Sequence, residues 1–360
     1  MNRRSIGLTK AALSALHYTG ADGMLSPLTS GVGVIFMLHH VRPEKPDGFQ
    51  PNRLLSITPE FLEAVIRFVV ERGFEVLSLG EVEQRLSEGE FDRPFACFTF
   101  DDGYRDNRQH AYPIFRRYGV PFAVYVPTDF PDGRGDLWWL KLEKVISALT
   151  TVEVKMNGAW TSFECRTRPQ KEAAFDQIYW WLRSISETEA RDVVAELCRL
   201  HGIEVDSMCR ELVMSWDEIR DLASDPLVTI GAHTRRHFAL AKLSAGEARQ
   251  EIAESVSRLE AELGRSCRHF SFPYGDEGSA CVREFELVRE LGLKTAVTTR
   301  KGLIHARHSK TLTSLPRLSL NGDFQKERYV KVMLTGAPFA IWDMARKLSR
   351  RQPAGGTAHV

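Results

Sequence analysis

The chain has 360 residues, of which 43% are hydrophobic and 26% are charged. Its 48 basic and 47 acidic residues leave a formal net charge of +1, so bulk charge gives no support for binding to nucleic acid or to an anionic membrane surface. The six cysteines form no CxxC pair, and no apolar run is long enough to span a bilayer. A soluble protein with one large α/β domain, or two smaller ones, follows from this composition.

The N-terminal stretch 1–30 begins with basic residues, as an export signal does. Four polar residues between Thr9 and His17 interrupt its apolar part, so a continuous hydrophobic region is missing. We therefore expect an amphipathic helix packed on the domain and a cytoplasmic protein. The Arg3-Arg4 pair leaves a twin-arginine export signal open as the alternative.

Strands and helices alternate along the next hundred residues. Short apolar runs bounded by proline or glycine predict buried strands, whereas apolar positions at the helical period predict helices. The expected elements are strands at 33–38, 74–77, 95–100 and 121–126 and helices at 59–72, 79–86 and 107–118. This alternation implies parallel strands with right-handed crossovers, hence a barrel or a doubly wound sheet.

A turn-rich and then aromatic segment interrupts the alternation. We assign 131–214 to an insertion built mainly of helices, because it is longer than the connections usual within an α/β unit. Alternation resumes with capping boxes at Ser215 and Ser244, and the main domain extends over 31–322. Over 323–360, peripheral helices are expected, followed from Arg350 by a tail without fixed structure. Further strands are expected at 227–230, 267–272, 294–297 and 315–318, and helices at 215–223, 244–263 and 280–291.

Polar residues follow four of the expected strands, at the end where parallel strands place ligands. Each motif alone is more often a turn or a pair of solvated or core histidines, so the combination carries the interpretation. Two histidines four residues apart and one carboxylate can hold a metal ion and leave positions open for water and substrate. The four groups are His39 and His40, Asp101 and Asp102, His233 and His237, and Pro273-Tyr274-Gly275.

A second carboxylate beside such a site stays free to take a proton from the metal-bound water, whose pKa the ion lowers. The resulting hydroxide can attack an acyl carbon. The metal and a backbone N–H would meet the developing oxyanion charge, and a histidine is suited to protonate a departing amine or alcohol. The pattern therefore indicates metal-assisted hydrolysis of an acyl group.

Three motifs, in this order, resemble those of the polysaccharide deacetylase family, also called the nodulation-protein-B homology domain. They are TFDDG at 99–103, HTxxH at 233–237 and FPYG at 272–275. The resembling region runs from about residue 30 to about residue 320, with the insertion excepted. The resemblance implies a distorted (β/α) barrel and a divalent metal cofactor, most often Zn²⁺.

The resemblance also implies roles for individual residues by motif position. Asp101 would be the catalytic base, and the backbone N–H of Tyr274 would be the oxyanion donor. The implied metal ligands are Asp102, His233 and His237.

Two positions depart from the family pattern. The third motif often begins with an arginine that orients the catalytic base, and here that position is Ser271. We expect Arg317 to replace it, with Arg235 and Arg236 as alternatives, although each is more often a surface charge. The late Leu-x-His motif that usually supplies the general acid reads Leu-Pro-Arg at 315–317, without a histidine.

One branch of the family, which de-N-acetylates exopolysaccharides, has its acid histidine in an early Tyr-His-x-Val segment. Leu38-His39-His40-Val41 is similar to that segment. The similarity implies that His39 is the general acid and His40 is its neighbour. The alternative is that His39 only hydrogen-bonds loop backbone.

The function that follows is metal-dependent hydrolysis of N-acetyl groups of an amino-sugar-containing glycan or glycan precursor. The partner is then an acetylated glycan. An O-acetyl esterase is the nearest alternative, because the same water and base serve either carbonyl. A non-catalytic glycan-binding domain is the other, and the presence of both aspartates and both histidines favours the enzyme.

Overall fold

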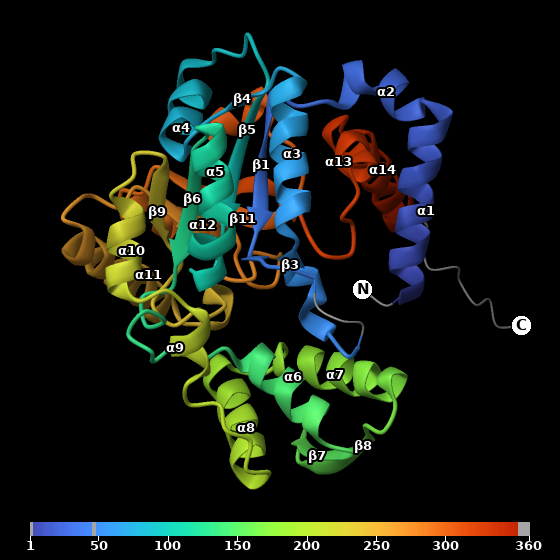
Figure 1. Cartoon of the computed structure of the whole chain (residues 1–360), viewed down its shortest axis with the longest axis vertical. Coiled ribbons are helices and arrows are strands. Elements are labelled where there is room, and N and C mark those ends of the chain that lie inside the picture. Colours follow the sequence, from blue (N-terminus) through green and yellow to red (C-terminus); the bar gives the residue numbers. More distant parts are fainter. Residues whose placement is uncertain (1–2, 45–47, 352–360) are drawn as a thin grey trace, which may run out of the picture.

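Seven parallel strands close into a barrel at the centre of the molecule (Figure 1). The computed structural model describes residues 3–44 and 48–351. The barrel strands are β1 (Gly33–Leu38), β5 (Phe95–Phe100), β6 (Phe122–Val126), β9 (Val228–Ala232), β10 (His269–Ser271), β11 (Thr295–Lys301) and β12 (Leu315–Ser319). β1 pairs with β12 on one side and with β5 on the other, which closes the barrel, while β4 (Glu75–Val76) adds to β5. The predicted (β/α) barrel is confirmed.

The two sides of each barrel strand contact different parts of the core, because successive side chains of a strand point in opposite directions. On β5, Phe98 and Phe100 belong to the cluster between the barrel and its helices. Phe95 and Cys97 belong to a second cluster, which side chains of β1, β6, β11 and β12 complete inside the barrel. All six residues of β5 are buried, so the apolar run that predicted the strand is explained by burial on both sides.

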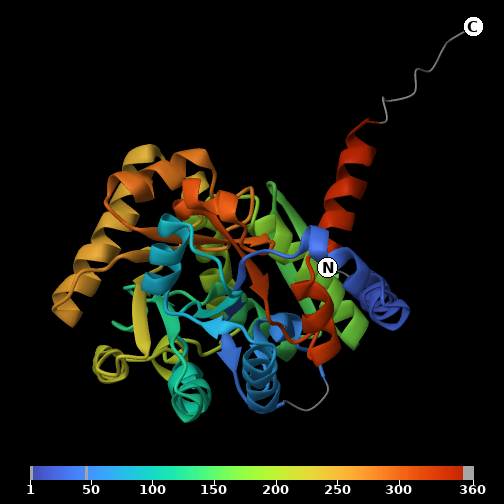
Figure 2. The ribbon, with the colours of Figure 1, turned by 90° about the horizontal axis from the view of Figure 1, so that it is seen from above.

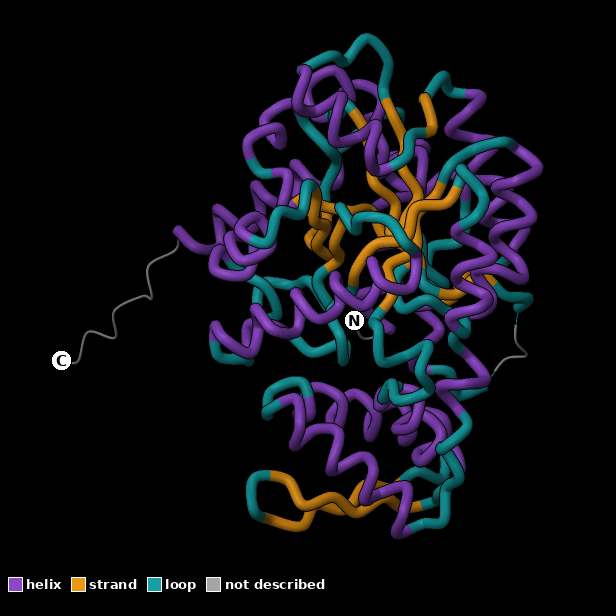
Figure 3. Tube along the Cα trace, turned by 90° about the vertical axis from the view of Figure 1, so that its left-hand side faces the viewer, coloured by secondary structure: helices purple, strands orange, loops and turns teal. Residues whose placement is uncertain are grey.

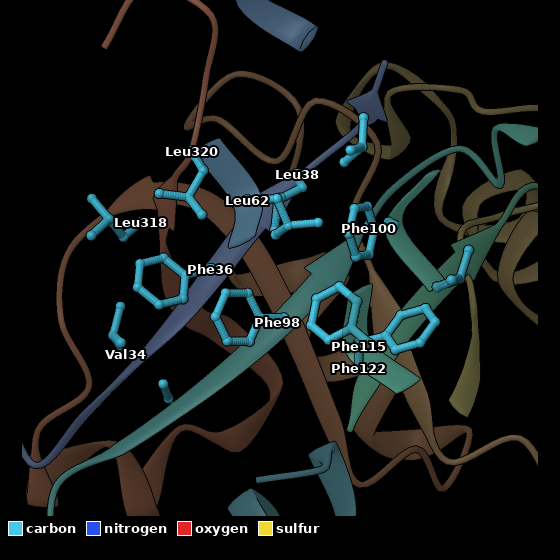
Figure 4. Packing of buried hydrophobic residues seen from close by; sticks show 14 of the residues in the cluster. Val34, Phe36, Leu38, Leu62, Phe98, Phe100, Phe115, Phe122, Leu318 and Leu320 are labelled. Atoms are coloured by element: carbon cyan, nitrogen blue, oxygen red, sulfur yellow. The ribbon is translucent and has the colours of Figure 1, made fainter. Parts of the chain in front are cut away.

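Aromatic rings fill the layer between the barrel and the helices (Figure 4). The ring of Phe98 stacks on Phe36 with centroids 4.9 Å apart, and Phe115 stacks on Phe122 at 4.5 Å. Leu62, from the helix after the first barrel strand, is buried in the same cluster. This packing fixes the strands against the helices and so fixes where the strands end.

Helices surround the barrel in the view from above (Figure 2). Their bounds are α3 (Pro59–Glu71), α4 (Leu79–Glu88), α5 (Tyr112–Tyr118), α10 (Trp216–Ala223), α11 (Ala245–Leu263) and α12 (Val282–Glu290). The capping boxes predicted at Ser215 and Ser244 are both formed. The helix predicted over 107–118 instead begins with a π-helical turn, Asn107–Ala111, a distortion that is frequent beside functional sites.

The insertion forms a second body against the carboxyl ends of the barrel strands (Figures 1 and 3). It contains α6 (Trp138–Ala148), β7 (Thr151–Met156), β8 (Ala159–Glu164), α7 (Arg168–Leu182), α8 (Glu187–Leu200) and α9 (Met208–Leu212). It is mainly helical, but the antiparallel hairpin of β7 and β8 was not predicted. Its turn, Asn157-Gly158, has φ of 52° and 84°, and this dipeptide between alternating residues is a strong hairpin signal.

The two ends of the described chain pack together on the side of the barrel (Figure 1). They form α1 (Arg3–Thr19), α2 (Ala21–Thr29), α13 (Glu327–Leu334) and α14 (Ala337–Arg351). A single amphipathic helix was expected at the start, but Gly20, with φ of 72°, divides it into two. The tail was expected from Arg350, whereas α14 continues to Arg351, and 352–360 lie outside the described residues. Among the described residues, no helix combines the length and apolar character needed to cross a membrane.

Candidate active site

The side chains predicted to act in catalysis come from different strands and meet at one end of the barrel. His39, Asp101 and Arg317 each lie an even number of residues from an interior side chain of their strand, so the strand period turns them inward. His233 follows Ala232, whose side chain belongs to the outer cluster, and therefore also turns inward. The two-residue period thus explains why groups far apart in sequence share one site.

Asp102, His233 and His237, the metal ligands that the resemblance implies, lie together and could hold a metal ion. One potential ligand atom from each lies within 4.8 Å of the others, and all three residues are buried. The Nε2 atoms of His233 and His237 lie 3.5 Å and 3.2 Å from Oδ1 of Asp102. Asp102 reaches this position because its φ of 74° turns the chain sharply after Asp101.

The donor set of this cluster fits a divalent metal ion. Nδ1 of His233 must donate its proton to the carbonyl oxygen of Ser271, 2.7 Å away, because a carbonyl can only accept. In the neutral ring, Nε2 then turns a lone pair toward Asp102 Oδ1, which is buried without a hydrogen-bond donor. Burial lowers the pKa of His237 although Asp102 opposes the shift, which favours the neutral imidazole that binds metals. A cation would satisfy all three groups.

Arg317 binds Asp101 through both guanidinium nitrogens. Nη1 donates to Oδ1 at 2.9 Å and Nη2 donates to Oδ2 at 2.6 Å, and Arg317 is only 1% exposed. Burial raises the pKa of Asp101, but Arg317, together with His233 and His39, more than offsets this and holds the pKa below its usual value. Asp101 is therefore an ionised carboxylate in a fixed orientation, as a proton acceptor requires.

Ser271 leaves room for this arginine. Its Oγ accepts a hydrogen bond from Arg317 Nη2 at 3.1 Å, so an arginine arriving from β12 occupies the interior next to β10. The alternatives pair elsewhere: Arg235 binds Asp129, and Arg236 binds Glu251. The structure therefore places Arg317, and neither alternative, on Asp101. Its effect on catalysis stays a prediction.

The ring of His39 faces Asp101, with Nε2 4.0 Å from Oδ2. Burial lowers the pKa of His39, although Asp102 and Asp101 oppose the shift. Within the described part of the chain, the ring makes no hydrogen bond to loop backbone, which was the alternative reading of this residue. Its role as general acid stays a prediction.

Two residues that hold the His39 segment were missed in the sequence. Asn107 Nδ2 donates to the His39 carbonyl at 2.7 Å, and His40 Nδ1 lies 2.6 Å from Asp106 Oδ2. The Val41 N–H also donates to Asp106. The sequence signal for them was the Asp106-Asn107 pair three residues beyond the TFDDG motif, at the start of the π-helical segment.

The backbone of Tyr274 is free to serve as an oxyanion donor. Its N–H donates no hydrogen bond to any residue in 3–44 or 48–351, and its φ of 61° is left-handed. Its ring lies 4.9 Å from that of His237, so the residue borders the candidate metal cluster. Left-handed non-glycine residues concentrate here: Asp102, Thr234, His237 and Tyr274 are four of the five among the described residues.

The fold and this cluster define a class: a parallel (β/α) barrel with a candidate metal centre at the carboxyl ends of its strands. Part of the chain resembles the polysaccharide deacetylase family. The family model described as Polysaccharide deacetylase matches residues 175–296, a stretch that contains His233, His237 and Tyr274.

Comparison with known proteins gives the same fold. The chain aligns with the deacetylase PplD of Streptococcus pyogenes at a TM-score of 0.56 and 17% identity, covering 83% of this chain and 97% of that one. It aligns with IcaB of Ammonifex degensii at a TM-score of 0.52 and 16% identity, covering 84% of this chain and 97% of that one. Likeness at this level of identity establishes the fold alone.

One curated relative aligns along most of the chain. The poly-beta-1,6-N-acetyl-D-glucosamine N-deacetylase of Escherichia coli (strain K12) is 20% identical over 326 residues, which is 82% of this chain and 38% of that protein. The matched stretch covers 38% of the length of this E. coli protein and 26% of the length of another curated relative. The activity of the whole E. coli protein therefore supports only a proposal about this chain.

Proposed function

We propose that this protein hydrolyses N-acetyl groups of an amino-sugar-containing glycan or glycan precursor, with Zn²⁺ bound by Asp102, His233 and His237. One observation carries the proposal: adjacent aspartates have separate surroundings. Arg317 binds Asp101, whereas Asp102 faces two histidines. Two carboxylates in different environments can serve as proton acceptor and metal ligand within one site.

The residues of the chain divide the reaction among them. Asp101 accepts the proton of the attacking water, and Arg317 keeps its carboxylate oriented. The Tyr274 N–H donates to the oxyanion as it develops on the acyl oxygen. His39 protonates the departing amine. When bound, the cation supplies Lewis acidity toward water and the acyl oxygen.

The name of the E. coli relative favours amide over ester substrates. The test is acetate release by zinc-loaded protein from two matched sets of oligosaccharides, N-acetylated and O-acetylated. We expect release from the N-acetylated set. Release only from the O-acetylated set would establish an esterase. No release from either set, with metal bound, would favour a glycan-binding domain.

Removing the metal should abolish acetate release and lower the melting temperature. A ligand that binds only the folded state at 100 times its Kd stabilises it by about 2.7 kcal/mol. Calorimetry before and after treatment with a chelator measures the shift, and one equivalent of Zn²⁺ should reverse it. The matched control is His233→Ala, whose melting temperature should respond little to either treatment. Equal melting temperatures for metal-loaded and metal-free wild type would contradict the assignment.

Replacing His39 by alanine should lower turnover by a factor of about 10² and leave the bound zinc unchanged, because the ring contacts Asp101 and is not in the metal cluster. Initial rates of acetate release and elemental analysis check both parts. His201→Ala, at an exposed position beyond α8, is the control and should keep wild-type turnover. Unchanged acetate release by His39→Ala would remove this residue from the mechanism.

A further inference from the structure

We propose that the insertion is part of the active site: Trp138, Arg183 and Arg191 are positioning residues that hold the backbones of Tyr274 and His237. The proposal rests on the proposed function for its catalytic consequence. Figures 1 and 3 show the insertion against the end of the barrel where the candidate site lies. The three residues come from α6, the end of α7 and α8, whereas Tyr274 and His237 follow barrel strands.

The insertion holds Tyr274 from two directions. The indole N–H of Trp138 donates to the Tyr274 hydroxyl at 2.9 Å, and Trp138 is almost fully buried. The Arg183 guanidinium lies 3.5 Å from the centre of the Tyr274 ring. Arg183 Nη2 also donates to Ser279 Oγ at 2.7 Å, so the arginine is itself tied to the barrel. The Tyr274 side chain therefore cannot move without breaking contacts with the insertion.

Arg191 holds His237 through the backbone. Its Nη2 donates to the carbonyl oxygen of His237 at 3.1 Å, and its Nη1 donates to Glu187 Oε2 at 2.9 Å. Arg191 and Glu187 are both buried, and Lys242 Nζ lies 3.2 Å from the other Glu187 oxygen. A buried guanidinium with fixed partners thus fixes the carbonyl of a candidate metal ligand.

Both held residues have a left-handed backbone, with φ of 59° at His237 and 61° at Tyr274. A residue with a Cβ keeps such a conformation only where its surroundings enforce it. The barrel supplies part of this restraint, since Thr234 Oγ1 accepts from the His237 N–H and Thr299 Oγ1 donates to the Tyr274 carbonyl. The insertion supplies the remaining restraint through the side chains of Trp138, Arg183 and Arg191.

The position of a backbone donor matters because the oxyanion exists only in the transition state. A displacement of about 1 Å in a positioned group can lower the rate by about 10²-fold. Loosening Tyr274 should therefore lower kcat and leave KM nearly unchanged. Loosening His237 should instead weaken metal binding, because residues that orient ligands contribute to metal affinity by about 10- to 100-fold.

A double-mutant cycle tests the Tyr274 contact. Trp138→Phe removes the indole donor and Tyr274→Phe removes the hydroxyl that accepts from it. We expect each to lower kcat about tenfold with little change in KM, and the double variant to be no slower than either single one, because all remove the same contact. Trp160→Phe, on the exposed hairpin of the insertion, is the control and should keep wild-type kcat.

Metal affinity tests the Arg191 contact independently of turnover. Arg191→Met should weaken zinc binding at least about tenfold, and Arg191→Lys should restore part of the loss. Arg199→Met is the matched control on the same helix, where the side chain is 70% exposed, and should bind zinc as the wild type does.

The outcomes separate this inference from the proposed function. Independent effects of Trp138→Phe and Tyr274→Phe that multiply in the double variant would overturn the Tyr274 contact, and zinc affinity unchanged in Arg191→Met would overturn the His237 contact. If the wild type releases no acetate, the proposed function fails, and the zinc affinities still decide whether the insertion positions the site. Should Trp138→Phe not fold, Tyr274→Phe tests the same contact from the barrel side.

Discussion

Replacing Asp101 by asparagine should lower turnover of an N-acetylated oligosaccharide by a factor of about 10²–10⁴ while the content of bound metal stays the same. The physical reason is that an amide cannot accept the proton of the attacking water. The proposed ligand cluster of Asp102, His233 and His237 does not include Asp101, so the metal should remain. Acetate release and elemental analysis of the same sample measure the two quantities together.

The matched control is Asp217→Asn, at a side chain that is 90% exposed on α10. It should change neither turnover nor metal content. If Asp101→Asn kept full turnover, another group would have to accept the proton. If it lost metal together with activity, Asp101 would be a ligand and the division of roles between the two aspartates would be wrong.

Much of the site could be predicted because its residues obey a local rule. Short apolar runs marked the strands, and polar residues at their carboxyl ends marked the shared edge of a parallel barrel. Because successive side chains of a strand point to opposite sides, His39, Asp101 and Arg317 then point toward the barrel interior. This alternation also separates Arg317 from Arg236, which has the parity of the outward-facing Ala232, but not from Arg235, which has the parity of His233.

The remaining parts depend on contacts that no local pattern encodes. Trp138 meets Tyr274 across 136 residues, and Arg191 meets His237 across 46. Neither the indole nor the guanidinium belongs to a motif, so their sequence surroundings predict only a buried aromatic residue and a helical charge. The β7–β8 hairpin differs, because its Asn157-Gly158 turn was a readable signal that the helical interpretation of the insertion overrode.

Ser271 shows how a missing residue can be replaced from another strand. An arginine there would reach Asp101 from β10, whereas Arg317 reaches it from β12 and donates to Ser271 Oγ on the way. Thr99, on the same strand as Asp101, accepts from the same guanidinium at 3.1 Å. The interior of the barrel thus accommodates one arginine with three acceptor side chains and the Thr298 carbonyl around it. We expect the loss of this buried charge pair to affect stability most.

Arg317→Met should therefore destabilise the protein by about 3–5 kcal/mol, because it leaves the Asp101 carboxylate buried without a counter-charge. Chemical unfolding with urea at neutral pH, with wild type and variant in the same metal state, measures this loss. The double variant Asp101→Asn/Arg317→Met removes both charges and should recover most of it. A double variant as unstable as Arg317→Met would show that lost packing, and not the unpaired charge, causes the effect.

The dependence on pH has a defined sign. In the wild type the folded-state pKa of Asp101 is lowered, so its contribution to stability is present above the pKa of the unfolded chain and is lost as the pH falls through the folded value. Without Arg317, burial is the largest remaining influence on the Asp101 pKa, opposed only by His233 and His39, and we expect it to raise the folded pKa above that of the unfolded chain. Above that raised pKa, ionisation of the buried Asp101 carboxyl destabilises the folded state. Lowering the pH protonates the carboxyl and removes this destabilisation. The stability difference between wild type and Arg317→Met should consequently be largest near neutral pH and shrink on acidification, whereas a loss of packing alone would give a difference independent of pH.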